Sequence, residues 1–305
     1  MPSFKPSHGL VQGDPLSPYL FILCMENLSI AINNAVQQGA CDPIHTTTNG
    51  PRLSHLLFAD DVLIFSKAKN SQLKFITELF VRFSKASGLK INISKSRAFF
   101  SAGAPQAKIN KLTTLIVIRS TTSQDKYLGF PILKGRARRS DFHFIIEKMQ
   151  SRLASWKSKL LNKAGRLTLA SSVLSSIPSY YTRIAWLPQN ICDIIDQTTR
   201  NFIWRDANNE GIHLVGWKKI ARPKYQGGLG IRSARETNIC LLGKLVWDML
   251  QSSNKLWVDL LSDKFYDGPR LLSATARPSD SSTWSAIIHA KKLSQIQFLV
   301  ARRVR

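Results

Sequence analysis

Hydrophobic and polar positions in the first hundred residues follow a helical pattern, then a strand pattern, then a helical pattern again. Apolar side chains recur at the spacing of one helix face between residues 16 and 35, which predicts a helix that begins after Asp14 and ends near Val36. Asp14 suits the helix N-cap and Pro15 the first helical position. A second helix is predicted over Leu73 to Phe83 with a stop at Gly88, followed by two short strands in LKINISKSRAFFS.

Between these helices, residues 55–65 read HLLFADDVLIF, which predicts a hairpin with Asp60 and Asp61 between its strands. Tight hairpin turns need positive φ and favour Asn-Gly or Asp-Gly, so two adjacent acids break a local rule. Apolar residues at successive positions predict strands buried on both faces, where unpaired charge is costly unless a cation lies nearby. A polar turn is the simpler explanation of two acids, whereas the apolar flanks favour a site for Mg²⁺, which takes oxygen ligands.

The pattern from about Lys134 onward is helical and basic. Residues 134–166 contain ten Lys or Arg against two acids, which predicts a basic surface. The apolar spacing predicts a helix from Leu167 that stops at Pro178, and two more over Ile191 to Trp204 and Ala234 to Leu250. A loop rich in glycine and lysine, RPKYQGGLGIR, precedes the last of these helices.

Composition indicates a globular protein with a polyanionic partner. The 305 residues are 44% hydrophobic, enough for one large core or two smaller ones. The 43 Lys and Arg against 19 Asp and Glu leave a net charge of +24 and a pI near 10.3, which favours nucleic acid. An anionic membrane surface could use the same charge, but the longest apolar run, Tyr19 to Met25, is far shorter than the about 20 residues of a spanning helix.

The first residues and the cysteines indicate in which cellular compartment the protein acts. The opening MPSFKPSHGL has neither the apolar core of a secretory signal nor the pattern of a transit peptide, which predicts a protein of the nucleus or cytoplasm. The four cysteines lie far apart, with no CxxC pair to hold zinc, and are predicted to be reduced thiols in the core.

The hairpin sequence resembles the FxDD hairpin of reverse transcriptases, and neighbouring motifs occur in the order of that family. GLVQGDPLSPYLFIL lies upstream, and SGLKINISKS and YLGFP lie downstream. NKAGRLTLASSVLSSIPSYY and PKYQGGLGIR are similar to the region that follows the polymerase in LINE-type, non-LTR retrotransposons, particularly those of plants. The resemblance extends from about Gly9 to Phe265.

This resemblance implies a two-metal Mg²⁺ site whose catalytic ligands include Asp60 and Asp61, with Asp60 the firmer ligand, while Asp14 caps its helix. Template and nucleotide would contact Gln12, Gly13, and Lys90 or Lys95. The primer end would rest on Tyr127, Leu128 and Gly129. The nucleic-acid backbone would contact Lys134, Arg136, Arg138 and Arg139. The implied partners are an RNA template, a DNA primer and deoxynucleotide triphosphates.

The predicted fold class is α+β, with a partial polymerase palm over residues 1–133, a helical basic thumb over 134–205 and a helical C-terminal extension over 206–305. The family's third catalytic acid lies well upstream of GLVQGDP, and the eight residues before Gly9 contain no acid. We therefore expect an RNA-directed DNA polymerase that is incomplete, inactive alone and poorly soluble, because part of its sheet and helices is uncovered. A non-catalytic remnant that binds RNA or DNA, in the manner of a maturase-like scaffold, is the alternative. An unrelated Mg²⁺ phosphohydrolase would leave the other motifs unexplained.

Overall fold

The chain folds into two units in the computed structural model, one over Met1–Thr122 (unit 1) and one over Ser123–Arg305 (unit 2). The structure describes residues 13–47, 50–101, 103–116, 118–120, 126–131, 137–155, 161–205, 211–251, 254–265 and 271–303. Helices and small sheets occur together, which confirms the mixed fold class in outline. The assignment of palm and thumb stays a prediction.

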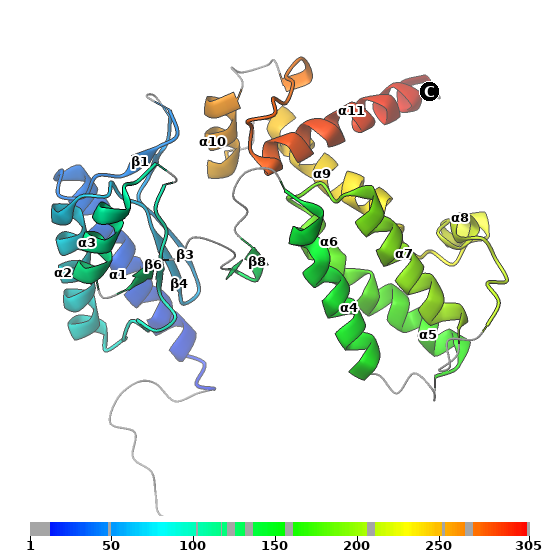
Figure 1. The fold of residues 1–305 in the computed structure, drawn as a ribbon, viewed down its shortest axis with the longest axis horizontal. Helices are drawn as coiled ribbons and strands as arrows, with labels where there is room; N and C mark the ends of the chain where they lie inside the picture. The colour runs from blue at the N-terminus through cyan, green and yellow to red at the C-terminus, as the bar shows by residue number, and fades with distance from the viewer. Residues whose placement is uncertain are drawn as a thin grey trace, which may run out of the picture. The chain divides into compact units, whose positions relative to one another are not determined.

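Unit 1 places three helices beside a short hairpin (Figure 1). The helices are α1 (Ser17–Gln37), α2 (Asn70–Ser87) and α3 (Gln106–Ile116). The strands are β1 (Ile44–His45), β2 (Arg52–Leu53), β3 (His55–Phe58), β4 (Asp61–Ile64), β5 (Arg97–Ala98) and β6 (Arg119–Ser120). β1 pairs with β2 and β3 with β4 in antiparallel fashion, and β5 pairs with β6 in parallel.

The core of unit 1 forms where one face of α1 packs against the hairpin and α2. Met25, Leu28 and Ile32 are buried there, and partly buried residues of the hairpin and α2 pack against them. The helix begins later than predicted, at Ser17, because the Asp14 carboxylate accepts a hydrogen bond of 2.9 Å from the N–H of Leu16 and shapes a turn before the helix.

The opposite face of α1 exposes large apolar side chains. Leu16, Tyr19, Ile22 and Leu23 are exposed to 64%, 68%, 59% and 60%. These side chains form an exposed apolar surface, while the uncovering of the sheet by a missing N-terminal part and the poor solubility stay predictions. Among the described helices, α1 alone is long and apolar enough to cross a membrane, but a core helix passes the same test and α1 has a packed face.

The predicted strands after α2 are largely absent. α2 does end at Gly88, which has a φ of 75°. In the next segment, the side-chain oxygen of Asn92 accepts hydrogen bonds from Ser94 Oγ and the N–H of Lys95, and its carbonyl accepts one from the N–H of Ser96. This local turn competes with strand pairing, so only β5 forms.

Unit 2 is mainly helical. Its hairpin strands are β7 (Lys126–Tyr127) and β8 (Phe130–Pro131), and its short non-α helices are η1 (Arg139–Phe142), η3 (Ala170–Leu174) and η4 (Lys224–Gln226). Its α-helices are α4 (His143–Ser155), α5 (Lys163–Leu169), α6 (Ser176–Thr182), α7 (Gln189–Trp204), α8 (Trp217–Ile220), α9 (Ala234–Leu250), α10 (Leu256–Phe265) and α11 (Ser282–Arg303). Helix α9 has the predicted bounds, and α7 begins two residues earlier than predicted.

The prediction that a helix stops at Pro178 is wrong. The helical run is interrupted earlier, by the π-helical turn η3, and Pro178 lies buried in the first turn of α6. N–H groups in the first turn of a helix have no intrahelical partner, so proline loses no hydrogen bond there.

Two hydrophobic clusters build unit 2, and α9 contributes to both. The first, called core A, includes Phe142, Met149, Leu174 and Ile191, together with Ala234 at the start of α9. The second, called core B, contains Leu242, Val246 and Met249 of α9 with Val258, Leu271, Trp284, Ala286, Ile287, Ile288 and Ala290. Helix α9 therefore links the two cores.

The four cysteines are free thiols in different environments. Cys41 and Cys192 are buried, Cys24 is half-buried and Cys240 is exposed, so the prediction of core thiols fails for Cys240. Burial raises the pKa of the Cys41 thiol and raises the pKa of Cys192 to about 11.

Candidate active site at the Asp60–Asp61 hairpin

The two predicted catalytic acids lie at the tip of the hairpin formed by β3 and β4. The register pairs Leu57 with Val62 and Phe58 with Asp61, which leaves Ala59 and Asp60 as the two-residue turn. Ala59 has a φ of 48°, so the positive φ falls on Ala59 and Asp61 is the first residue of β4. The acids therefore do not form the turn together, as the sequence predicted, because the turn lies one residue earlier. An alanine with left-handed backbone angles is strained, and strained backbone of this kind is common at functional sites.

The faces of the hairpin differ. Leu57, Val62 and Ile64 pack against α1 and α2. Because side chains alternate along a strand, Asp61 and Phe58 lie on the other face, and Phe58 is 59% exposed. The expectation of strands buried on both faces is not met, since every described residue of β3 and β4 is exposed or half-buried.

Asp60 and Asp61 have the ligand chemistry for a divalent cation whose remaining ligands come from the substrate. Both are exposed, and neither is paired with a cation in the described part of unit 1. Mg²⁺ commonly uses one or two carboxylates plus substrate phosphates, which these adjacent acids fit. The described residues contain no group of three or more His, Cys, Asp or Glu side chains that could hold a metal, so no third acidic ligand accompanies the two adjacent carboxylates among them.

His55 fastens the base of the hairpin to α1. Its Nε2 and Nδ1 lie 2.9 Å from the hydroxyl oxygens of Ser29 and Ser54 respectively. Burial lowers the pKa of His55, and the Glu26 carboxylate opposes this shift only in part. The sequence signal, a histidine beginning a strand, gave no hint of this role.

We expect unit 1 to lose stability when His55 is protonated. The folded pKa lies below the unfolded value of about 6.5, so the unfolded chain binds the proton more readily. The contribution is complete above that pH and is lost as the pH falls through it. Pulse proteolysis in urea at pH 5.5 and 7.5, scored on peptides of unit 1, should show a drop that His55→Asn removes. The exposed control His45→Asn should keep the drop, and an equal pH response in all three proteins would contradict the assignment.

The residues predicted to contact template and nucleotide are only partly described. Gln12 lies outside the described residues. Gly13 has a φ of 92°, which a side chain would strain, and precedes the turn into α1. Lys90 and Lys95 are both exposed in the segment after α2, so the structure does not choose between them.

The predicted primer-contacting residues form a second hairpin, in unit 2. Leu128 and Gly129, with φ of 50° and 78°, make the turn between β7 and β8. The Tyr180 hydroxyl donates a hydrogen bond of 2.5 Å to the carbonyl of Leu128, and the Phe130 and Tyr181 rings lie 5.8 Å apart. These contacts hold the hairpin against α6.

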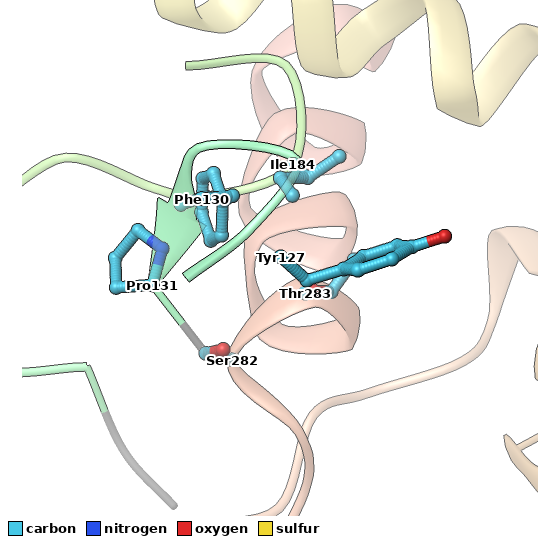
Figure 2. Close-up of a pocket in the computed structure, with 7 residues that line it drawn as sticks. Tyr127, Phe130, Pro131, Ile184, Ser282 and Thr283 are labelled. Carbon is cyan, nitrogen blue, oxygen red and sulfur yellow. The ribbon is translucent and has the colours of Figure 1, made fainter. Parts of the chain in front are cut away.

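A pocket of about 240 Å³ lies beside this second hairpin (Figure 2). Tyr127, Phe130 and Pro131 line one part of it, and Ser282 and Thr283 line it from the first turn of α11. Sequence reasoning missed the last two residues, because about 150 positions separate them from the YLGFP motif and no local pattern marks them.

Of the four predicted backbone-contacting residues, the structure describes two. Lys134 and Arg136 lie outside the described residues. Arg138 and Arg139 are exposed at the start of η1, where the N–H of Arg138 donates a hydrogen bond of 2.7 Å to Asp141. Their side chains are thus accessible to a polyanion.

The chain is similar to one protein family and to several known proteins. Residues 3–132 match the family described as reverse transcriptase (RNA-dependent DNA polymerase). A retrovirus-related Pol polyprotein from a type-2 retrotransposable element of Drosophila melanogaster is 27% identical over 301 residues, which covers 92% of this chain and 27% of the relative. A putative ribonuclease H protein of Arabidopsis thaliana is 41% identical over 160 residues, covering 52% of this chain and 26% of the relative. An uncharacterized mitochondrial protein of the same plant is 61% identical over 56 residues, covering 18% of this chain and 46% of the relative.

The hairpin that carries Asp60 and Asp61 thus lies in a segment that matches a class of nucleic-acid polymerases. Residues 3–132 belong to the reverse transcriptase family, and the resemblance to LINE-type, non-LTR retrotransposons is confirmed. The chain spans 26–46% of the length of these three relatives.

Proposed function

We propose that this chain is the palm and thumb part of an RNA-directed DNA polymerase in which Asp60 and Asp61 bind Mg²⁺ for templated nucleotidyl transfer. The supporting observation is a pair of exposed, adjacent carboxylates at a hairpin tip within the segment that matches the reverse transcriptase family. Its substrates are an RNA template, a DNA primer and deoxynucleotide triphosphates.

Asp60 and Asp61 would hold the Mg²⁺, which would supply activation of the attacking hydroxyl and charge stabilisation at the phosphates. The strained turn at Ala59 places the two carboxylates at the tip of the hairpin. The nucleotide contacts the segment at Gln12 and Gly13. It also contacts one of two exposed lysines, Lys90 or Lys95.

In unit 2, the Tyr127–Gly129 hairpin supports the primer end. Basic residues from Lys134 to Arg139 contact the backbone of the RNA–DNA duplex in a salt-sensitive way. The charge of +24 supports this role.

A non-catalytic protein that binds RNA or DNA is the second candidate. It is favoured by the absence of a three-ligand metal group among the described residues, together with the basic charge. In that case the acids have no role, and replacing them leaves binding unchanged.

Primer extension on an RNA template with Mg²⁺ tests the proposal, together with Mn²⁺ binding followed by electron paramagnetic resonance. In Asp60→Asn/Asp61→Asn, we expect any extension product of the wild type to fall by about 100-fold or more, since ligands of one metal act as a unit. Stoichiometric Mn²⁺ binding should disappear as well, while salt-sensitive RNA binding persists.

A matched control, Glu78→Gln/Asp259→Asn, removes two exposed acids elsewhere and should behave as the wild type. Equal Mn²⁺ binding and equal extension in the wild type and the Asp60/Asp61 double variant would refute the polymerase proposal. RNA binding retained by all proteins in that event would establish the second candidate.

A further inference from the structure

The loop after α8 forms a hydrogen-bonded platform that exposes one tyrosine. Tyr225 is 86% exposed, although it lies in a well-ordered turn that begins with η4. The N–H groups of Gly228, Leu229 and Gly230 donate hydrogen bonds to the carbonyls of Pro223, Ile220 and Arg222, with lengths of 3.2, 2.9 and 3.0 Å. These bonds close residues 220–230 into a compact loop.

Glycine is required in this loop for two reasons. Gly227 and Gly230 have φ of 77° and 68°. A Cβ at Gly228 would lie 2.0 Å from the carbonyl oxygen of Arg222, which is impossible without moving the backbone. The loop therefore has little freedom to withdraw Tyr225 from solvent.

The platform is anchored to core A. Ile220 and Ile231, at its two ends, are each 1% exposed and pack in that core. The indole N–H of Trp217 donates a hydrogen bond of 2.9 Å to the carboxylate of Asp196. An ordered, anchored loop that exposes a large aromatic ring is unusual, because burial of the ring would be favourable.

The surroundings of Tyr225 are cationic. Residues 211–235 contain six Lys or Arg and no Asp or Glu. Lys218, Lys219, Arg222 and Lys224 are exposed on α8 and on the loop itself. The Asp196 carboxylate that reaches this region already accepts hydrogen bonds from Trp217, Ser233 and the N–H of Ala234.

We propose that this loop binds single-stranded nucleic acid, with an unpaired base stacked on Tyr225 and the neighbouring phosphates held by Lys218, Lys219, Arg222 and Lys224. An exposed aromatic ring among cations is the arrangement that binds single strands, because every base has a face that can stack and every phosphate a charge. The site lies outside all motifs assigned to the polymerase reaction. It rests on the proposed function only for the choice of nucleic acid as the ligand.

The test is fluorescence anisotropy with a labelled oligouridylate RNA and the full chain, without Mg²⁺ or nucleotide. Tyr225→Ala should raise the Kd about 10-fold, because the base loses its stacking partner, and Tyr225→Phe should retain wild-type affinity. Leu214→Ala removes another apolar side chain, 67% exposed and close in sequence, and should leave the Kd unchanged. With a duplex of equal length, Tyr225→Ala should have no effect.

The charges are tested by salt dependence. Lys218→Gln/Lys219→Gln should reduce the slope of log K against log salt by about 0.7 per lost phosphate contact. Lys108→Gln/Lys111→Gln on α3 removes the same charge and should leave the slope unchanged.

Unchanged RNA affinity in Tyr225→Ala would overturn the proposal and leave a protein as the occupant of this exposed surface. Equal weakening by both lysine pairs would overturn it too, because binding would then follow net charge alone. The assay contains no Mg²⁺ and no nucleotide, so its outcome does not depend on the chemistry proposed for Asp60 and Asp61. Failure of the polymerase proposal therefore leaves the Tyr225 result intact, and the reverse also holds.

Discussion

Replacing Asn238 by leucine should destabilise unit 2 by about 3 kcal/mol or more, since several buried backbone groups lose their partners at once. Asn238 is fully buried in α9. Its side-chain oxygen accepts a hydrogen bond of 3.0 Å from the N–H of Leu187, and its amide group donates to the carbonyls of Thr182 and Ala185 at 2.8 and 2.9 Å. Thr182, Ala185 and Leu187 are themselves only 1%, 2% and 0% exposed, so we expect no water to replace the lost side chain.

Because of the position of Asn238, its replacement should destabilise both cores of unit 2. It lies on α9 between Ala234 of core A and Leu242 of core B, so it fixes the chain between α6 and α7 against the helix that both cores share. Arg235 strengthens the same junction, with a hydrogen bond of 2.7 Å to the carbonyl of Leu187. Both cores should therefore unfold at lower denaturant.

Urea unfolding followed by tryptophan fluorescence measures this change in unit 2 alone, because all seven tryptophans lie after residue 155. Glu236→Leu, a polar-to-leucine change on the exposed side of the same helix, is the control and should shift the midpoint little. A midpoint for Asn238→Leu that matches this control would show that the buried network adds no stability.

Replacing Trp284 by alanine should cost about 3–5 kcal/mol of stability in core B, because it empties the space of the largest fully buried side chain among the described residues. Trp284 is 0% exposed, and its ring stacks on Phe265 with centroids 4.9 Å apart and an angle of 5° between the planes. The cavity would open beside Phe265 where α10 meets α11.

Trp247→Ala is the matched control for Trp284, since Trp247 is 47% exposed on α9 and should cost about 1 kcal/mol or less. Both variants remove one of the seven fluorophores, so their urea midpoints compare directly. Similar midpoint shifts would contradict the assignment of Trp284 to a close-packed core.

Local signals in the sequence were enough to predict several elements. The bounds of α9, the stop of α2 at Gly88 and the hairpin around Asp60 follow from apolar spacing, glycine and strand-forming residues. These features depend on neighbours in sequence, which pattern reasoning can read. The acids themselves were found because charge interrupts an apolar run.

The failures lie where a competing local bond or a distant contact decides the structure. Asn92 forms a turn in place of a strand, and the π-helical turn before Ser175 moves Pro178 into a first helical turn. The junction at Asn238 joins residues more than fifty positions apart, and nothing in the local sequence distinguishes it from an exposed asparagine. Likewise, RPKYQGGLGIR was predicted as a loop, but its internal hydrogen bonds and the exposure of Tyr225 were not.

Alkylation of a buried cysteine in each unit reports when that unit opens. Cys41 is 2% exposed in unit 1 and Cys192 is 1% exposed in unit 2, so an alkylating reagent reaches each sulfur only when its own unit opens. Cys240 is exposed, so its alkylation rate serves as the reference for an accessible thiol. Because the three sites fall on different peptides, the order in which they gain mass distinguishes units that open independently from units that open together, with no introduced label.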